Sequence, residues 1–137
     1  MEHLYHGTIQ KDLEVIKPFK RFTPGGADLA DQIPPRIYAT YNPAYAVSHS
    51  FPWSSGDGVD TKVEGETICI VVPKQKAAIL EQPICVYTLP ADSFTYTTEE
   101  ETGLTYHSES EVTPIKCHCF ASVIEAMAAY SGKIELV

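Results

Sequence analysis

The residues best suited to chemistry lie in two short segments, residues 4–8 and residues 37–40. Each segment reads as a β-strand that stops abruptly at polar side chains. In the first segment, His6 places a donor and an acceptor on one flat ring, Gly7 permits close approach to the backbone, and Thr8 adds a hydroxyl. This combination suits a ribose hydroxyl and an amide, although His6 alone would equally serve to cap a turn.

The second segment leads into a helix with readable boundaries. Asn42 can cap this helix, and Pro43 suits its first position. We expect the two strands to lie side by side, with their C-terminal ends at one cleft. Tyr45 lies on another stripe of the helix, where it either covers the core or faces the rim of the cleft under Tyr38. The residues at helical spacing that form the inward face are Ala44, Val47 and Phe51.

The second half of the chain is rich in predicted strands. Residues 53–66 are polar and glycine-rich, which predicts a long loop, either a functional lid or a merely mobile segment. A second helix opens at Ser122, which has the spacing of a capping box with Glu125. Short strands with two helices indicate an α+β fold dominated by antiparallel sheet. The predicted strands cover residues 67–72, 84–89, 94–98, 104–112, 115–120 and 134–137.

Length and charge narrow the classes of function. The 137 residues fit a single domain, residues 1–137, with no internal repeat or linker. A formal charge of -8 disfavours binding to duplex DNA, because phosphate contacts need clustered Lys and Arg. No apolar run approaches the length of a membrane span, and the N-terminus lacks the layout of a signal peptide. We therefore expect a cytoplasmic protein that does not contact a membrane.

The four cysteines are predicted to be free thiols. The chain is large and apolar enough to fold without disulfides, and a thiol in an apolar strand behaves as a small hydrophobic group. Only one residue separates Cys117 from Cys119, whereas zinc sites usually have a two-residue gap and a second pair of ligands. We therefore predict no metal. The other two cysteines are Cys69 and Cys85.

The order of these motifs resembles the ADP-ribosyltransferase superfamily, which includes the poly(ADP-ribose) polymerases, the diphtheria-type toxins and the RNA 2′-phosphotransferases. The likeness is to small bacterial and phage members, and it spans residues 4 to 115 with a gap between residues 8 and 35. Residues 86–94 are similar to the segment that precedes the last motif of these members. The resemblance implies a split, mainly antiparallel β-sheet with a few short helices around a nucleotide cleft.

The resemblance also implies roles for individual residues in binding NAD. His6 would hydrogen-bond a ribose hydroxyl, the backbone of Gly7 would hold the nicotinamide carboxamide, and Thr8 would lie beside the adenosine ribose. Tyr38 would stack on the nicotinamide ring, with Tyr45 as a second aromatic wall. Holding the ring and the ribose matters because cleavage of the bond between them passes through a cationic sugar. The implied cofactor-binding residues are His6, Gly7, Thr8, Tyr38, Ala39 and Tyr45.

The catalytic acid is the point where the sequence departs from the family pattern. The transferases usually place a Glu at the head of a late strand, and alignment on Ser108 puts Thr105 at that position. Strand alternation places Thr105 and Glu109 on one face, so Glu109 would reach the pocket if a bulge shifts the register. Alternatively, Glu109 and Glu111 only solvate an exposed face.

Three hypotheses follow for the function. The first is an NAD-dependent enzyme that transfers ADP-ribose to an unidentified protein or nucleic-acid acceptor, with NAD as its substrate and Glu109 as its acid. The second is a non-catalytic module that binds NAD or ADP-ribose after losing the acid. The third is a different α+β domain in which the motifs coincide by chance. RNA 2′-phosphotransfer is disfavoured, because it needs several arginines for phosphates and only Arg21 and Arg36 are present.

Overall fold

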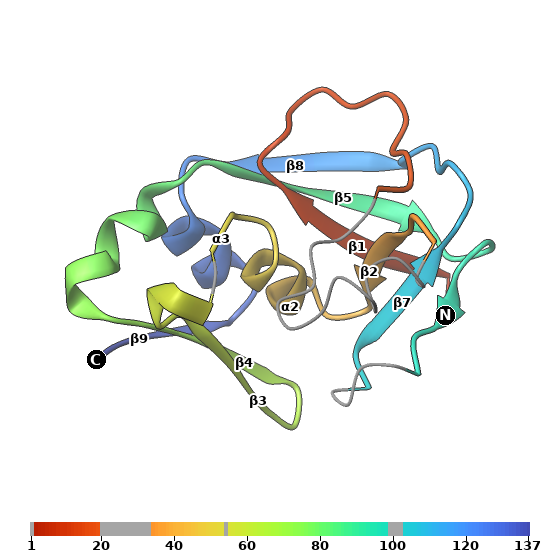
Figure 1. Cartoon of the computed structure of the whole chain (residues 1–137). Helices are drawn as coiled ribbons and strands as arrows, with labels where there is room; N and C mark the ends of the chain where they lie inside the picture. The colour runs from red at the N-terminus through yellow and green to blue at the C-terminus, as the bar shows by residue number, and fades with distance from the viewer. Residues whose placement is uncertain (1, 20–33, 54, 99–102) are drawn as a thin grey trace.

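Two β-sheets form the framework of the computed structural model, which describes residues 2–19, 34–53, 55–98 and 103–137 (Figure 1). In spatial order, the larger sheet consists of β6 (Thr95–Tyr96), β7 (Thr105–Ser108), β2 (Ile37–Thr40), β1 (His3–Thr8), β5 (Ile84–Pro90) and β8 (Lys116–Phe120). The smaller sheet consists of β3 (Asp60–Glu64), β4 (Thr67–Val72) and β9 (Lys133–Leu136). All neighbours pair antiparallel except β4 and β9, so the fold is α+β and mainly antiparallel, as expected.

The helices begin at the caps that the sequence indicates. Asn42 Oδ1 accepts a hydrogen bond from the backbone N–H of Ala44 at 3.0 Å, and this bond caps the α-helix that begins at Pro43. Ser122 Oγ accepts one from the backbone N–H of Glu125 at 3.1 Å, and this bond caps the α-helix that begins at Val123. In the described part of the chain, no helix is long and apolar enough to cross a membrane. Among the described residues, the helical elements are α2 (Pro43–Ser48), α3 (Val123–Ala129) and the 3-10 helices η1 (Ser55–Asp57) and η2 (Lys74–Glu81).

The helix α2 lies between the two sheets and contributes to the main core (Figure 1). The predicted inward residues Ala44, Val47 and Phe51 are all buried there. A second core covers the opposite face of the larger sheet. Strand β5 serves both cores, because Val86 packs in the main core and Tyr87, the next residue, packs in the second. Burial on both faces explains why β5 reads as a nearly continuous apolar run.

The two strands that carry the candidate site lie side by side, as expected, but their direction is not the expected one. They run antiparallel, with Tyr5 of β1 opposite Thr40 of β2. Their C-terminal ends therefore point in opposite directions, yet the last residues of the two strands, Thr8 and Thr40, both line one cavity, as expected. The sequence marks where each strand ends, whereas the relative direction depends on the path of the chain between them.

Residues 53–66 do not form the predicted long loop. They contain η1 and the strand β3, which pairs with β4 over five residue pairs, from Asp60 opposite Val71 to Glu64 opposite Thr67. The turn between the two strands includes Gly65, whose φ of +63° lies in the left-handed region that glycine adopts without strain. The residues of β3 alternate between exposed and half-buried, and few of their side chains are apolar. The sequence pattern therefore does not indicate a strand here.

The prediction of four free thiols is also wrong. Cys85 of β5 and Cys119 of β8 form a disulfide, while Cys69 and Cys117 are free. The two bonded cysteines stand directly opposite each other where β8 pairs antiparallel with β5. Cross-strand neighbours of this kind lie close enough to bond. The sequence identifies both strands but not their pairing. A prediction made from composition therefore cannot show that these two cysteines form a disulfide.

Candidate functional site

A cavity of about 800 Å³ lies against β1, β2 and α2, and its volume is typical of a site for a small molecule or cofactor. Further wall is supplied by Thr105 at the start of β7 and by part of the segment that follows β1, namely Ile9, Gln10, Leu13 and residues 15–19. The structure thus brings to one cavity all the binding residues that the sequence singles out. These residues are His6, Gly7, Thr8, Tyr38, Ala39 and Tyr45.

His6 lies at the point where β1 and β2 meet. Its Nδ1 atom lies 2.7 Å from the backbone carbonyl oxygen of Tyr38. A carbonyl oxygen can only accept, so Nδ1 carries the hydrogen. Burial lowers the pKa of His6 below its ordinary value of 6.5, although the bond to Tyr38 opposes this effect. The ring is therefore neutral at pH 7, and its Nε2 atom is an acceptor.

Tyr45 has both of the roles that the sequence leaves open. It is buried in the main core, and it also lines the cavity. Its ring stacks at a tilt on His49, with 4.5 Å between the ring centroids. His49 also lines the cavity, and its Nδ1 atom lies within hydrogen-bonding distance of Tyr45 O (3.1 Å) and Ser48 Oγ (2.9 Å). The sequence places His49 on one stripe with Tyr41 and Tyr45, four residues apart, but assigns it no role in the site.

Gly7 and Thr8 have structural roles that account for their residue types without any ligand. A Cβ atom on Gly7 would lie 2.3 Å from the carbonyl oxygen of Ala46 and 2.7 Å from Cβ of Ser50. Only glycine therefore lets the α2 region pack this closely on β1. The Thr8 hydroxyl accepts a hydrogen bond from the backbone N–H of Gln10 at 3.2 Å, which supports the turn after the strand.

The segment after β1 is held over the cavity by contacts distant in sequence. The hydroxyl of Tyr87 donates to the carbonyl oxygen of Gln10 (2.9 Å) and accepts from the N–H of Leu13 (3.1 Å). Further along, Ile16 bridges to Val112. These anchors place the last residues of the segment, including Lys17 and Phe19, on the cavity wall.

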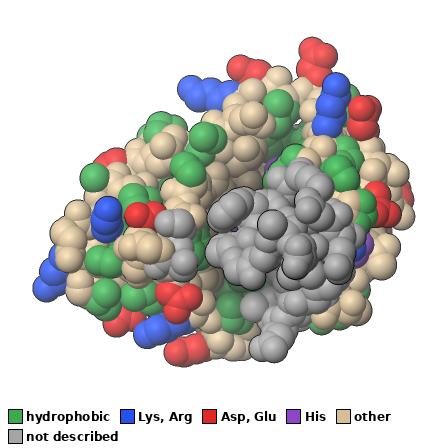
Figure 2. Space-filling view, in the orientation of Figure 1, with side chains coloured by type: hydrophobic (Ala, Val, Ile, Leu, Met, Phe, Trp, Pro, Cys, Tyr) green, Lys and Arg blue, Asp and Glu red, His purple; other side chains and the backbone are tan. Residues whose placement is uncertain are grey.

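Phe19 extends the aromatic lining, with its ring centroid 6.4 Å from that of His6. Among the described residues that line the cavity, Lys17 is the one Lys, Arg, Asp or Glu. On the face seen in Figure 2, by contrast, acidic and basic side chains are interspersed. In the sequence, Lys17 is simply one of three basic residues within five positions, with Lys20 and Arg21, and only the tertiary structure places it on the cavity wall.

Thr105, which the resemblance aligns with the acid of the transferases, carries a hydroxyl. Thr105 is buried, lines the cavity and stands opposite Thr40 in the pairing of β2 with β7. Glu109 lies one residue beyond the end of β7, is exposed, and is not among the described residues that line the cavity. No aspartate or glutamate of the described residues lines it.

The described lining of the cavity combines several kinds of chemical group. It offers aromatic and apolar walls, a neutral imidazole acceptor, hydroxyls and one ammonium group. No known protein family, curated protein or solved structure matches this chain.

Proposed function

We propose that the chain is a binding module for NAD or ADP-ribose, and that it holds the ligand without cleaving it. The observation that carries this proposal is the pairing of a dinucleotide-sized cavity with a hydroxyl, Thr105, where a transferase would have its acid. Cleavage of the nicotinamide–ribose bond develops positive charge on the sugar, which a nearby carboxylate stabilises. Binding needs no such group.

The lining residues suit the separate parts of such a ligand. The Nε2 acceptor of His6 would bind a ribose hydroxyl, and the rings of Tyr38 and Tyr45 would contact the nicotinamide. Lys17 would neutralise part of the diphosphate charge. A neutral His6 is the form that this assignment requires, because an imidazolium has no acceptor.

ADP-ribosyl transfer is the second candidate, since the residues that would bind NAD in a transferase line one cavity. Its acid would be Glu109, and the carboxylate would have to move from its exposed position toward the ligand. The two candidates therefore differ in whether Glu109 matters to a reaction.

Calorimetric titration of NAD and ADP-ribose, together with a measurement of nicotinamide release, tests the proposal. We expect both ligands to bind wild type without nicotinamide release. Binding should weaken roughly 2- to 12-fold in His6→Ala, the value of one neutral hydrogen bond, and stay unchanged in His3→Ala on the exposed end of the same strand. Nicotinamide release that disappears in Glu109→Gln would instead establish the transferase. Absence of binding by the folded protein at millimolar ligand would overturn both.

A further inference from the structure

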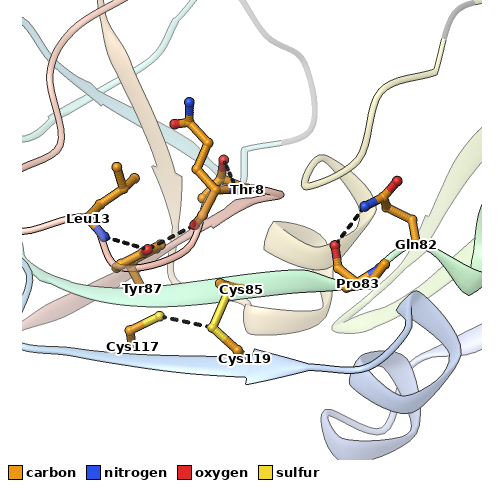
Figure 3. Close-up of a disulfide and its surroundings, with 9 residues drawn as sticks. Thr8, Leu13, Gln82, Pro83, Cys85, Tyr87, Cys117 and Cys119 are labelled. Carbon is orange, nitrogen blue, oxygen red and sulfur yellow. Dashed lines mark hydrogen bonds between the residues drawn. A yellow bond between two sulfur atoms is a disulfide. The ribbon is translucent and has the colours of Figure 1, made fainter.

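Three cysteine sulfurs meet on one face of the strand pair β5 and β8, and none of the three cysteines lines the cavity. Cys117 and Cys119 are two residues apart in the strand, so their side chains point to the same side. Cys85 stands opposite Cys119 on β5 and is bonded to it, and the Sγ atom of Cys117 lies 3.5 Å from that of Cys119 (Figure 3). All three sulfur atoms lie within 4.8 Å of one another.

We propose that these three cysteines, once the disulfide is reduced, form a binding site for a thiophilic cation such as Zn²⁺. The site would be independent of the ligand proposed for the cavity. It would exist in two forms, an oxidised form with the disulfide and no metal, and a reduced form with three thiolate ligands.

The geometry fits a metal held by three sulfurs. A Zn–S bond of about 2.3 Å in tetrahedral coordination separates the sulfur atoms by roughly 3.8 Å. The observed separation of 3.5 Å between the Cys117 and Cys119 sulfurs is close to this value, and reduction of the disulfide would let the Cys85 and Cys119 sulfurs move apart toward it. The gap of one residue between Cys117 and Cys119 does not argue against the site. Two-residue gaps suit ligands on a turn, whereas alternate residues of a strand share a face, and the third ligand comes from the neighbouring strand.

The three cysteines of the site differ in burial, with one buried and two exposed to solvent. Cys85 is 1% exposed and packs in the second core, whereas Cys117 and Cys119 are exposed. A reductant and a cation can therefore reach the two outer sulfurs, and solvent can supply a fourth ligand. Three protein ligands with an open fourth position are a common zinc arrangement.

The change of form requires a reductant, which we take to be a dithiol. The dithiol transfers two electrons and two protons, the S–S bond between Cys85 and Cys119 breaks, and the dithiol becomes a disulfide. Binding of Zn²⁺ then releases the protons of the three thiols and forms three Zn–S bonds. Disulfides persist in oxidising compartments and are reduced in reducing ones, so the metal form belongs to reducing conditions.

Titration of the reduced protein with Co²⁺, a spectroscopic substitute for Zn²⁺, tests the proposal. The full chain would be reduced with a phosphine, freed of it without air, and checked for folding by circular dichroism. We expect one Co²⁺ per chain with thiolate charge-transfer absorption, displaced by Zn²⁺. Protein with the disulfide intact, lighter by two hydrogens, should not bind. Cys117→Ser, which leaves the disulfide pair untouched, should weaken binding at least about tenfold.

Cys69→Ser is the matched control, because Cys69 is the other free cysteine and lies on β4 in the smaller sheet. It should bind as wild type does. If the reduced chain unfolds, Zn²⁺ should restore the circular dichroism spectrum in wild type and Cys69→Ser but not in Cys117→Ser. The proposal is wrong if reduced wild type neither binds nor refolds with either metal, or if Cys117→Ser matches wild type.

Discussion

The Nδ1 atom of His6 donates a 2.7 Å hydrogen bond to the backbone carbonyl of Tyr38, and this bond ties together the two segments that carry the candidate site. It joins β1 to β2 beside their register pair, Tyr5 opposite Thr40. It also determines the tautomer, because the proton on Nδ1 leaves Nε2 as the acceptor. This one hydrogen bond thus links β1 to β2 and leaves an acceptor, Nε2 of His6, at the cavity.

Acidification should destabilise the protein through His6. Burial lowers the pKa of His6 in the folded state below 6.5, so the unfolded chain takes up a proton first as pH falls. The unfolded state then binds more protons, and the free energy of unfolding falls by about 1.4 kcal/mol per pH unit from pH 6.5 down to the folded pKa. Above pH 6.5 both states are neutral and this contribution is constant.

Urea unfolding at several pH values measures the free energy of unfolding. The effect is the difference in its pH dependence between wild type and His6→Gln, which cannot take up the proton. His3→Gln is the control, because His3 is exposed on the same strand. An identical pH dependence in wild type and His6→Gln would contradict the prediction.

Removal of the Tyr38 ring should weaken binding of NAD. We expect Tyr38→Ala to lose about 1–3 kcal/mol, or roughly 5- to 150-fold in affinity, because aromatic stacking on a base has this value. Tyr41→Ala is a suitable comparison, since Tyr41 is exposed and does not line the cavity. If calorimetry gives equal affinities for NAD in the two variants, Tyr38 does not contribute to the binding site.

A carboxylate at residue 105 should allow the protein to cleave the NAD that it binds. Thr105 lines the cavity, so a glutamate there would stabilise the charge that develops when the nicotinamide–ribose bond breaks. We expect Thr105→Glu to release nicotinamide from NAD faster than wild type, and the uncharged Thr105→Gln to behave as wild type does. If the folded Thr105→Glu protein binds NAD but releases nicotinamide no faster than wild type, residue 105 does not lie where a catalytic acid would act.

Substitution of Gly7 should destabilise the fold rather than change only ligand binding. The Cβ atom of Gly7→Ala would lie 2.3 Å from the carbonyl oxygen of Ala46, so α2 would have to move away from β1. Overpacking of this kind costs about 1–3 kcal/mol. The midpoint of urea unfolding should fall accordingly. An unchanged midpoint with weaker binding of ADP-ribose would show that Gly7 serves the ligand alone.

The features that the sequence determines by itself are those that depend on neighbouring residues. Asn42 and Ser122 begin helices because a side-chain oxygen reaches an N–H group two or three residues ahead. Residues 84–89 read as a buried strand because their apolar run is short and continuous. The candidate binding residues from His6 to Tyr45 are recognisable for a similar reason, since each motif is a few adjacent residues.

The tertiary structure decides what depends on residues far apart in the chain. The antiparallel direction of β1 and β2, the bond between Cys85 and Cys119, and the place of Lys17 in the cavity all follow from pairings that no local pattern encodes. A strand offers the same hydrogen-bonding groups to any neighbour, so burial of the whole set of apolar faces selects its partner, direction and register. For the same reason Thr105, which the resemblance only aligns with the acid of the transferases, lines the cavity once β7 pairs with β2.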